Sequence, residues 1–99
     1  MQAKTYRILF TKKAEKDRQR VESYLEDLDT KQQRLLAIAQ ALSNLPTQWK
    51  INPYIDREDN LKVCYVANWY SIFYIADEAN QEISIVAILA QSEDLGRLA

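Results

Sequence analysis

The sequence predicts an α+β domain: one strand, then a helical hairpin, then an antiparallel β-meander. Residues 5–10 alternate in the manner of a strand, and apolar residues recur with helical spacing between residues 12 and 45. Residues 61–90 then read as three successive strands separated by polar breaks. A chain of 99 residues builds one small core, so we expect a single domain over residues 1–99, with the helices packed on one face of the sheet.

The first strand leads directly into the first predicted helix. Tyr6, Ile8 and Phe10 fall on one side of this strand. Thr11 follows at the position of a helix N-cap, where its hydroxyl accepts a backbone N–H. An amphipathic helix is expected over residues 12–28, with apolar positions at Ala14, Val21, Leu25 and Leu28.

A second helix is predicted to begin at Thr30, because Thr30 and Gln33 have the spacing of a capping box. Pro46 is expected to end it, since proline cannot donate to the helical ladder. The short connection predicts that the two helices run antiparallel and turn their apolar stripes the same way. The stripe of the second helix comprises Leu35, Ile38, Ala39, Leu42 and Leu45.

The strands of the meander are predicted at residues 61–67, 69–76 and 82–90. Asn68 is expected to supply the left-handed backbone of the first turn, and residues 77–81 form the second. The last strand is apolar on both faces, which predicts a central place in the sheet under the helices. Residues 49–56 are expected to form an edge strand or a loop, because they contain Pro53.

The composition excludes several classes of active site. The chain has no histidine and one cysteine, Cys64, so it can form neither a Ser–His or Cys–His nucleophilic pair nor a disulfide within the chain. The lone glycine, Gly96, excludes a glycine-rich phosphate loop. We expect no metal and no cofactor. No segment resembles a membrane span or a signal peptide, which predicts a cytoplasmic protein.

Charge is distributed unevenly along the chain. Residues 1–34 carry nine basic and six acidic residues, and residues 35–99 carry four basic and eight acidic residues. The basic third could contact nucleic acid or an acidic partner, or it could be a solvated helix face. Candidate contacts for a partner or for nucleic acid are Lys12, Lys13, Lys16, Trp69 and Arg97.

Aromatic residues and paired carboxylates each allow a functional and a structural interpretation. The strand aromatics Tyr65, Trp69, Tyr70, Phe73 and Tyr74 could stack on bases, but aromatics also favour strands and pack under helices. Packing is favoured for them, with Trp69 as the expected exception beside its turn. The adjacent pairs Glu58–Asp59 and Glu93–Asp94 are interpreted as solvated turns, and Cys64 as a buried strand residue.

Several segments, in this order, resemble the RelE/ParE superfamily of toxins from type II toxin–antitoxin systems. The resemblance spans about residues 5–95 and rests on apolar spacing and on the order of the segments. The matching segments are Tyr6 to Asp17 (YRILFTKKAEKD), Leu42-x-x-Leu45-Pro46, Trp69 to Asp77 (WYSIFYIAD), and Ile85-x-x-Ile88 followed by Asp94.

The resemblance implies a compact α+β toxin that inhibits growth and is silenced by a cognate antitoxin. Members act either on DNA gyrase or as ribosome-dependent mRNA endonucleases, and some serve in plasmid stabilisation. A homodimer is left open. Arginines that recur in the strands of the family fall near Cys64 and at Ser71 of this chain. Nuclease members have histidine or arginine near the end of the last strand, where this chain has Ala90 and Gln91.

These departures leave few groups for acid–base chemistry on RNA. Cleavage through the 2′-hydroxyl needs a base, a cation beside the phosphate and an acid for the leaving oxygen. The candidates are Lys62, Tyr70 and Glu93, with Tyr74 also considered. The sequence therefore favours a gyrase-directed, ParE-like mode over a nuclease. The alternative is a catalytically silent binding protein of this fold or a decayed toxin.

Overall fold

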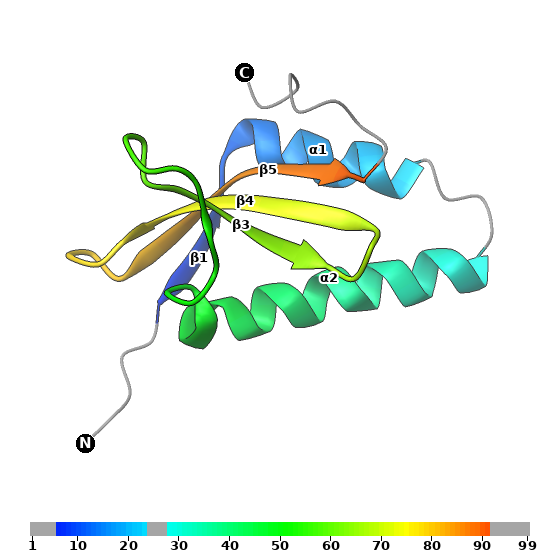
Figure 1. The fold of residues 1–99 in the computed structure, drawn as a ribbon. Coiled ribbons are helices and arrows are strands. Elements are labelled where there is room, and N and C mark those ends of the chain that lie inside the picture. The colour runs from blue at the N-terminus through cyan, green and yellow to red at the C-terminus, as the bar shows by residue number, and fades with distance from the viewer. Residues whose placement is uncertain (1–5, 24–27, 92–99) are drawn as a thin grey trace.

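The computed structural model describes residues 6–23 and 28–91, which form two helices and one five-stranded sheet (Figure 1). The predicted α+β class and the antiparallel meander are confirmed. The sheet has the strand order β1-β5-β4-β3-β2. In chain order the elements are β1 (Arg7–Phe10), α1 (Lys12–Ser23), α2 (Leu28–Gln48), β2 (Tyr54–Asp56), β3 (Leu61–Val66), β4 (Tyr70–Asp77) and β5 (Glu82–Ala90).

The sheet is mixed because the first strand pairs with the last. β1 runs parallel to β5, in a register from Arg7 opposite Glu82 to Phe10 opposite Ile85. Arg7 and Glu82 also form an ion pair at the start of this register. Two helices separate β1 from the meander, a connection long enough for parallel pairing. β5 therefore lies between β1 and β4, which confirms its predicted central place.

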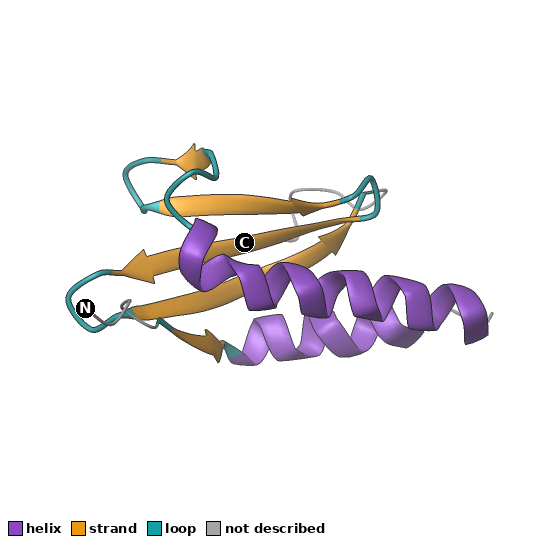
Figure 2. Cartoon of the chain, turned by 90° about the horizontal axis from the view of Figure 1, so that it is seen from below, coloured by secondary structure: helices purple, strands orange, loops and turns teal. Residues whose placement is uncertain are grey.

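Both helices cover one face of the sheet. They run antiparallel and lie side by side, as predicted (Figures 1 and 2). The core between the helices and the sheet includes Val21 of α1, Ile38 of α2 and Tyr74 of β4. A smaller apolar cluster on other sheet residues consists of Val63, Phe73, Ala87 and Leu89, with Leu61 packed against it.

Both predicted ends of the second helix were wrong. α2 begins at Leu28, so Thr30 lies inside it and does not cap it. At the other end, Pro46 lies within the helix, which continues to Gln48. Proline removes only its own N–H, and the last turn still closes through the Trp49 N–H and the Leu45 carbonyl, 2.9 Å apart.

The apolar stripe of α2 is narrower than predicted. Ile38 and Leu45 are buried, and Leu35 and Leu42 are half-buried. Ala39, which was expected in the stripe, is exposed. In α1, Ala14 and Val21 are buried as predicted. The predicted end of this helix at residue 28 was wrong, because Leu28 begins α2, and residues 24–27, with Leu25, lie outside the described residues.

α1 covers the edge of β5 that β1 leaves open. The Ile88 N–H donates to Asp17 Oδ2 over 3.1 Å, and Arg20 donates to the Ile88 carbonyl over 3.2 Å. Thr11 acts as the predicted N-cap, since its hydroxyl accepts from the Ala14 N–H at 3.1 Å and donates to the Ile85 carbonyl. The helix thereby satisfies backbone groups that a neighbouring strand would otherwise pair.

The turns adopt left-handed backbone at residues other than the one predicted. Ala67 has φ 51° between β3 and β4, so it takes the role expected of Asn68. Asn60, between β2 and β3, and Gln81, between β4 and β5, have φ 55° and 54°. Alanine has no side-chain oxygen to favour the left-handed conformation, so the residue type at position 67 does not predict it.

Candidate functional site

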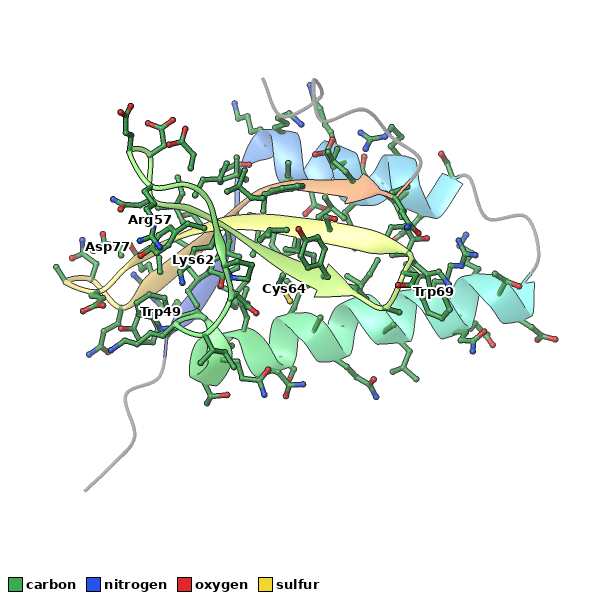
Figure 3. The ribbon with its side chains drawn as sticks, viewed as in Figure 1. Trp49, Arg57, Lys62, Cys64, Trp69 and Asp77 are labelled. Carbon is green, nitrogen blue, oxygen red and sulfur yellow. The ribbon has the colours of Figure 1, made fainter. Side chains whose placement is uncertain are left out.

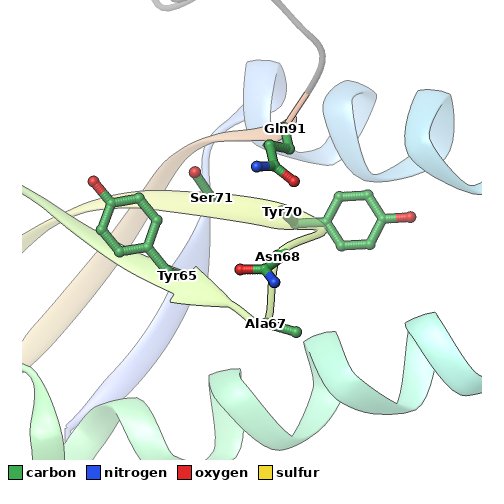
Figure 4. A pocket seen from close by; sticks show the side chains of 6 residues that line it. All are labelled: Tyr65, Ala67, Asn68, Tyr70, Ser71 and Gln91. Atoms are coloured by element: carbon green, nitrogen blue, oxygen red, sulfur yellow. The ribbon is translucent and has the colours of Figure 1, made fainter.

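A pocket of about 430 Å³ opens where the β3–β4 hairpin turns. We call it the hairpin-end pocket. Its lining is uncharged and offers hydroxyl groups, amides and aromatic rings (Figure 4). The lining residues are Tyr65, Ala67, Asn68, Tyr70, Ser71 and Gln91.

Strand register brings these residues together. Tyr65 of β3 lies directly opposite Ser71 of β4, and Tyr70 lies opposite Ala90 of β5. Gln91 follows β5 and is fixed by its N–H, which donates to the Trp69 carbonyl over 2.9 Å. Cross-strand neighbours on one face lie within contact distance. The turn at Ala67 therefore decides which side chains meet at this end of the sheet.

A second hollow of about 400 Å³ adjoins the first and shares Asn68 and Gln91 with it. Here the Arg34 guanidinium of α2 lies 5.2 Å from the centre of the Trp69 ring. Trp69 is half-buried beneath it, whereas Tyr65 is 62% exposed. Among the five aromatics of residues 65–74, the exposed one is thus Tyr65 and not, as expected, Trp69.

Lys62 is held by the backbone on the helix side of the sheet, away from the hairpin-end pocket (Figure 3). The side chain is part of a residue only 4% exposed, and its Nζ donates to the carbonyls of Lys50 at 3.0 Å and Asn52 at 2.6 Å. Burial, and then the nearby charge of Arg57, lowers the pKa of Lys62. Two of its three donors are therefore committed to main-chain oxygens.

The two tyrosine candidates are buried. The Tyr74 hydroxyl donates to the Trp49 carbonyl over 2.7 Å and accepts from Asn52 Nδ2 at 3.1 Å. Burial raises the pKa of Tyr74 to about 12. Tyr70 packs in the helix-side core and also lines the hairpin-end pocket. Packing is thus confirmed as the principal role of Tyr70 and Tyr74.

The three candidate lysines of α1 differ in exposure. Lys12 and Lys16 are exposed, and Lys13 forms an ion pair with Asp17, 3.0 Å from Nζ to Oδ2. Burial alone would raise the pKa of Asp17. Hydrogen bonds from Arg20, Lys13 and the Ile88 N–H outweigh that effect and lower it.

The remaining candidates are distributed differently. Glu58 and Asp59 are exposed in the turn after β2, as interpreted from the sequence, whereas Glu93 and Arg97 lie outside the described residues. Cys64 is half-buried, and burial raises the pKa of its thiol. In residues 6–23 and 28–91 no three acidic or thiol side chains gather as a metal site requires. Neither of the two helices described has the length and hydrophobicity of a membrane-spanning segment.

The four positions at which this chain departs from the arginine or histidine of the superfamily lie in different parts of the structure. Ser71 and Gln91 line the hairpin-end pocket, and Ala90 lines the adjoining hollow. Cys64 instead lies against the helix-side core. Sequence reasoning had named Ser71 and Gln91 only as departures, and it missed Tyr65 and Asn68 as lining residues. The predicted turn at residues 67–68 carried the signal, because it sets Tyr65 opposite Ser71.

The fold is that of a small α+β domain of the RelE/ParE kind. A family model described as the ParE toxin of the type II toxin–antitoxin system, parDE, matches residues 8–95. This chain therefore belongs to the ParE toxin family, and it is the toxin component of a type II toxin–antitoxin system. Its partner is an antitoxin.

A solved structure supports the same fold. The toxin–antitoxin complex RelBE2 from Mycobacterium tuberculosis contains a chain that superposes on this one with a TM-score of 0.65. The two are 18% identical, and the match covers 88% of this chain and 99% of that chain. At this low identity the match is evidence for a shared fold alone. No curated protein sequence matches this chain.

Proposed function

We propose that this toxin stops growth by acting on DNA gyrase and does not cleave mRNA. The observation that carries the proposal is the uncharged lining of the hairpin-end pocket. Two of its six residues depart from the resembled superfamily: Ser71 replaces the arginine of a recurring strand motif, and Gln91 lies where nuclease members have histidine or arginine near the end of the last strand. The match to the ParE family model supports the same choice.

The chemistry of RNA cleavage argues in the same direction. A base must remove the 2′-hydroxyl proton, and a cation must stabilise the charge that develops on the phosphate. The Lys62 ammonium is bound to two carbonyls on the helix side, and the Tyr74 hydroxyl is buried with a pKa of about 12. Neither group is poised to exchange a proton with a substrate in the pocket.

The same end of the sheet is suited to contact a protein. Tyr65 is a largely exposed aromatic side chain beside the amides of Asn68 and Gln91. Exposed tyrosines next to hydrogen-bonding side chains are typical of interface hot spots. We place the gyrase contact there. Gyrase acts on chromosomal DNA, so the toxin acts in the cytoplasm.

Induction of the toxin in bacteria tests this proposal. Growth should stop, the co-expressed antitoxin should restore it, and gyrase–DNA cleavage complexes should accumulate. Cleaved mRNA mapped on translating ribosomes, without such complexes, would replace the gyrase mode with the nuclease mode. Normal growth at high toxin levels would favour the silent or decayed alternative.

Two further sequence predictions remain to be tested. Sedimentation of the purified toxin at several concentrations decides whether it forms a homodimer. A role in plasmid stabilisation requires that loss of a plasmid carrying the toxin and antitoxin genes kills or arrests the plasmid-free cells.

A further inference from the structure

Three cations and two aromatic rings alternate at the end of the sheet opposite the hairpin-end pocket. Lys50 Nζ lies 5.5 Å from the Trp49 ring centre, and Lys62 Nζ lies 5.9 Å from the same ring. Lys62 Nζ is also 4.3 Å from the Tyr54 ring centre, and the Arg57 guanidinium is 4.8 Å from it. We call these five residues the cation–aromatic ladder.

The ladder lies where the α2–β2 connection meets β2 and β3. Trp49, Lys62 and Arg57 gather there in Figure 3, whereas Trp69 lies at the other end of β3. Trp49 is buried and Tyr54 is 39% exposed, so the ladder reaches from the core to the surface. The outer cations, Lys50 and Arg57, belong to exposed residues.

The ladder concentrates positive charge without a carboxylate partner. None of its three cations forms an ion pair within 4.0 Å with an acidic group of the described residues. Lys62 donates to two carbonyls, and its ammonium also faces the Tyr54 ring. The charge of Arg57 contributes to the lowered pKa of Lys62. An anion placed between these two cations would relieve their repulsion.

A small polar pocket lies beside the ladder. It has a volume of about 170 Å³ and is lined by Trp49, Tyr54, Asn60, Lys62, Ala76 and Glu78. A carboxylate group is small enough for this volume. Exposed acidic residues surround the site, with Asp56, Glu58 and Asp59 in the neighbouring turn. They repel the continuous charge of a nucleic-acid backbone more than a single inserted carboxylate.

We propose that the cation–aromatic ladder is the docking site for an aspartate or glutamate side chain of the antitoxin. This proposal rests on the antitoxin partnership and does not depend on the mode of toxicity. A carboxylate in the pocket lies beside the Lys62 charge and the Asn60 side chain, and Arg57, whose guanidinium is 4.8 Å from the Tyr54 ring centre, adds positive charge next to the pocket. Glu78 opposes it at the wall of the pocket and limits its affinity.

Binding of a defined peptide tests the site directly. The probe is an N-acetylated, C-amidated peptide with one glutamate among neutral residues, and its control replaces that glutamate by glutamine. Trp49 fluorescence in a Trp69→Phe background reports binding close to the ladder. We expect saturable binding of the glutamate peptide and about fivefold or more weaker binding of the glutamine peptide, as for a partly buried charge pair.

Single substitutions distinguish binding at the ladder from an effect of the overall charge of the protein. Arg57→Gln should weaken the glutamate peptide about fivefold, and Glu78→Gln should strengthen it. Lys16→Gln, on the exposed surface of α1, removes the same charge far from the ladder and should leave binding within about twofold. Lys62→Met should also abolish binding, but Lys62 is buried, so the exposed Arg57 carries the decisive variant.

Three outcomes would overturn the proposal. They are equal binding of the two peptides, unchanged binding by Arg57→Gln, or tighter binding of an oligothymidylate than of the glutamate peptide. In cells, Arg57→Gln should stay toxic alone and need more antitoxin for rescue. If the unsubstituted protein were not toxic, that result would instead count against the proposed function. Failure of the ladder proposal and failure of the proposed function are therefore distinguishable.

Discussion

The hydroxyl group of Tyr74 helps to fix the position of the α2–β2 connection on the sheet. Tyr74 projects from the middle of β4 and bonds the Trp49 carbonyl just after α2. Asn52 and Lys62 add hydrogen bonds in the same small region. A buried polar cluster of this kind stabilises one arrangement of the connection because each group is satisfied only there.

Tyr74→Phe should destabilise the protein by about 1–3 kcal/mol, because it leaves the buried Trp49 carbonyl without its donor. The measurement is the free energy of unfolding from urea titration. Tyr65→Phe is the matched control, since the Tyr65 side chain is largely exposed and should change stability by less than about 0.5 kcal/mol. Equal effects of the two substitutions would contradict this role for Tyr74.

Tyr65→Ala should reduce gyrase inhibition about tenfold or more, as expected for an exposed aromatic at the centre of a protein contact. Thermal unfolding should change little, because the side chain is 62% exposed. Ile51→Ala, at an 80% exposed apolar residue of the α2–β2 connection, serves as the control and should retain full inhibition. Full activity of Tyr65→Ala would remove the hairpin-end pocket from the gyrase contact.

Asp17 should make stability depend on pH below the ordinary carboxyl range. Its folded pKa is lowered, so its stabilising contribution is complete above the unfolded value of 3.8 and is lost as pH falls through the folded value. Asp17→Asn should cost about 3 kcal/mol near neutral pH, because Arg20 and Lys13 lose their buried partner. Urea midpoints measured from about pH 6 to about pH 2 should converge for the two proteins. A constant gap would contradict the assignment.

At the scale of elements, α1 is held at the open edge of β5 by hydrogen bonds as well as by its apolar face. Thr11 caps the helix and bonds the Ile85 carbonyl. Further along the helix, Asp17 and Arg20 satisfy the backbone groups of Ile88. The helix thus blocks further strand addition where β1 ends.

Thr11→Ala should cost about 1–2 kcal/mol, since it removes both the cap and the bond to β5. Thr47→Ala is the matched control near the end of α2, where the hydroxyl bonds only the exposed Asn44 carbonyl in the described residues. It should be close to neutral. The measurement is the free energy of unfolding of both variants from chemical denaturation. An equal loss of stability in Thr47→Ala would contradict the claim that Thr11 joins α1 to β5.

The sequence predicted the elements better than their ends. Periodic apolar residues placed both helices and all three meander strands, because burial on one face imposes that spacing. Helix ends depend on single backbone bonds, so Pro46 and Thr30 misled the prediction. Ala67 likewise adopts a conformation that its own side chain does not favour, because the pairing of β3 with β4 imposes it.

At the scale of the whole molecule, parallel pairing of β1 with β5 was invisible in the sequence. It joins residues about 75 positions apart, and local patterns carry no record of such contacts. The same holds for the candidate site. Ser71 and Gln91 were recognised as departures, but their meeting with Tyr65 depends on strand register. The cation–aromatic ladder also joins residues from separate elements, so no single motif announced it.

The overall charge pattern is consistent with a protein target at one end of the sheet and an antitoxin contact at the other. The hairpin-end pocket is uncharged, and the ladder is positive. The two lie at opposite ends of β3 (Figure 3). An antitoxin that occupies the ladder therefore need not compete directly with a target at the pocket, and neutralisation also requires that the antitoxin cover Tyr65.

The most direct measurement is DNA supercoiling by purified gyrase in the presence of the purified toxin, alongside translating ribosomes programmed with a defined mRNA. The gyrase mode predicts dose-dependent loss of supercoiling, reversed by the antitoxin, and intact mRNA on the ribosomes. Cleavage of the ribosome-bound mRNA with unaffected supercoiling would contradict it.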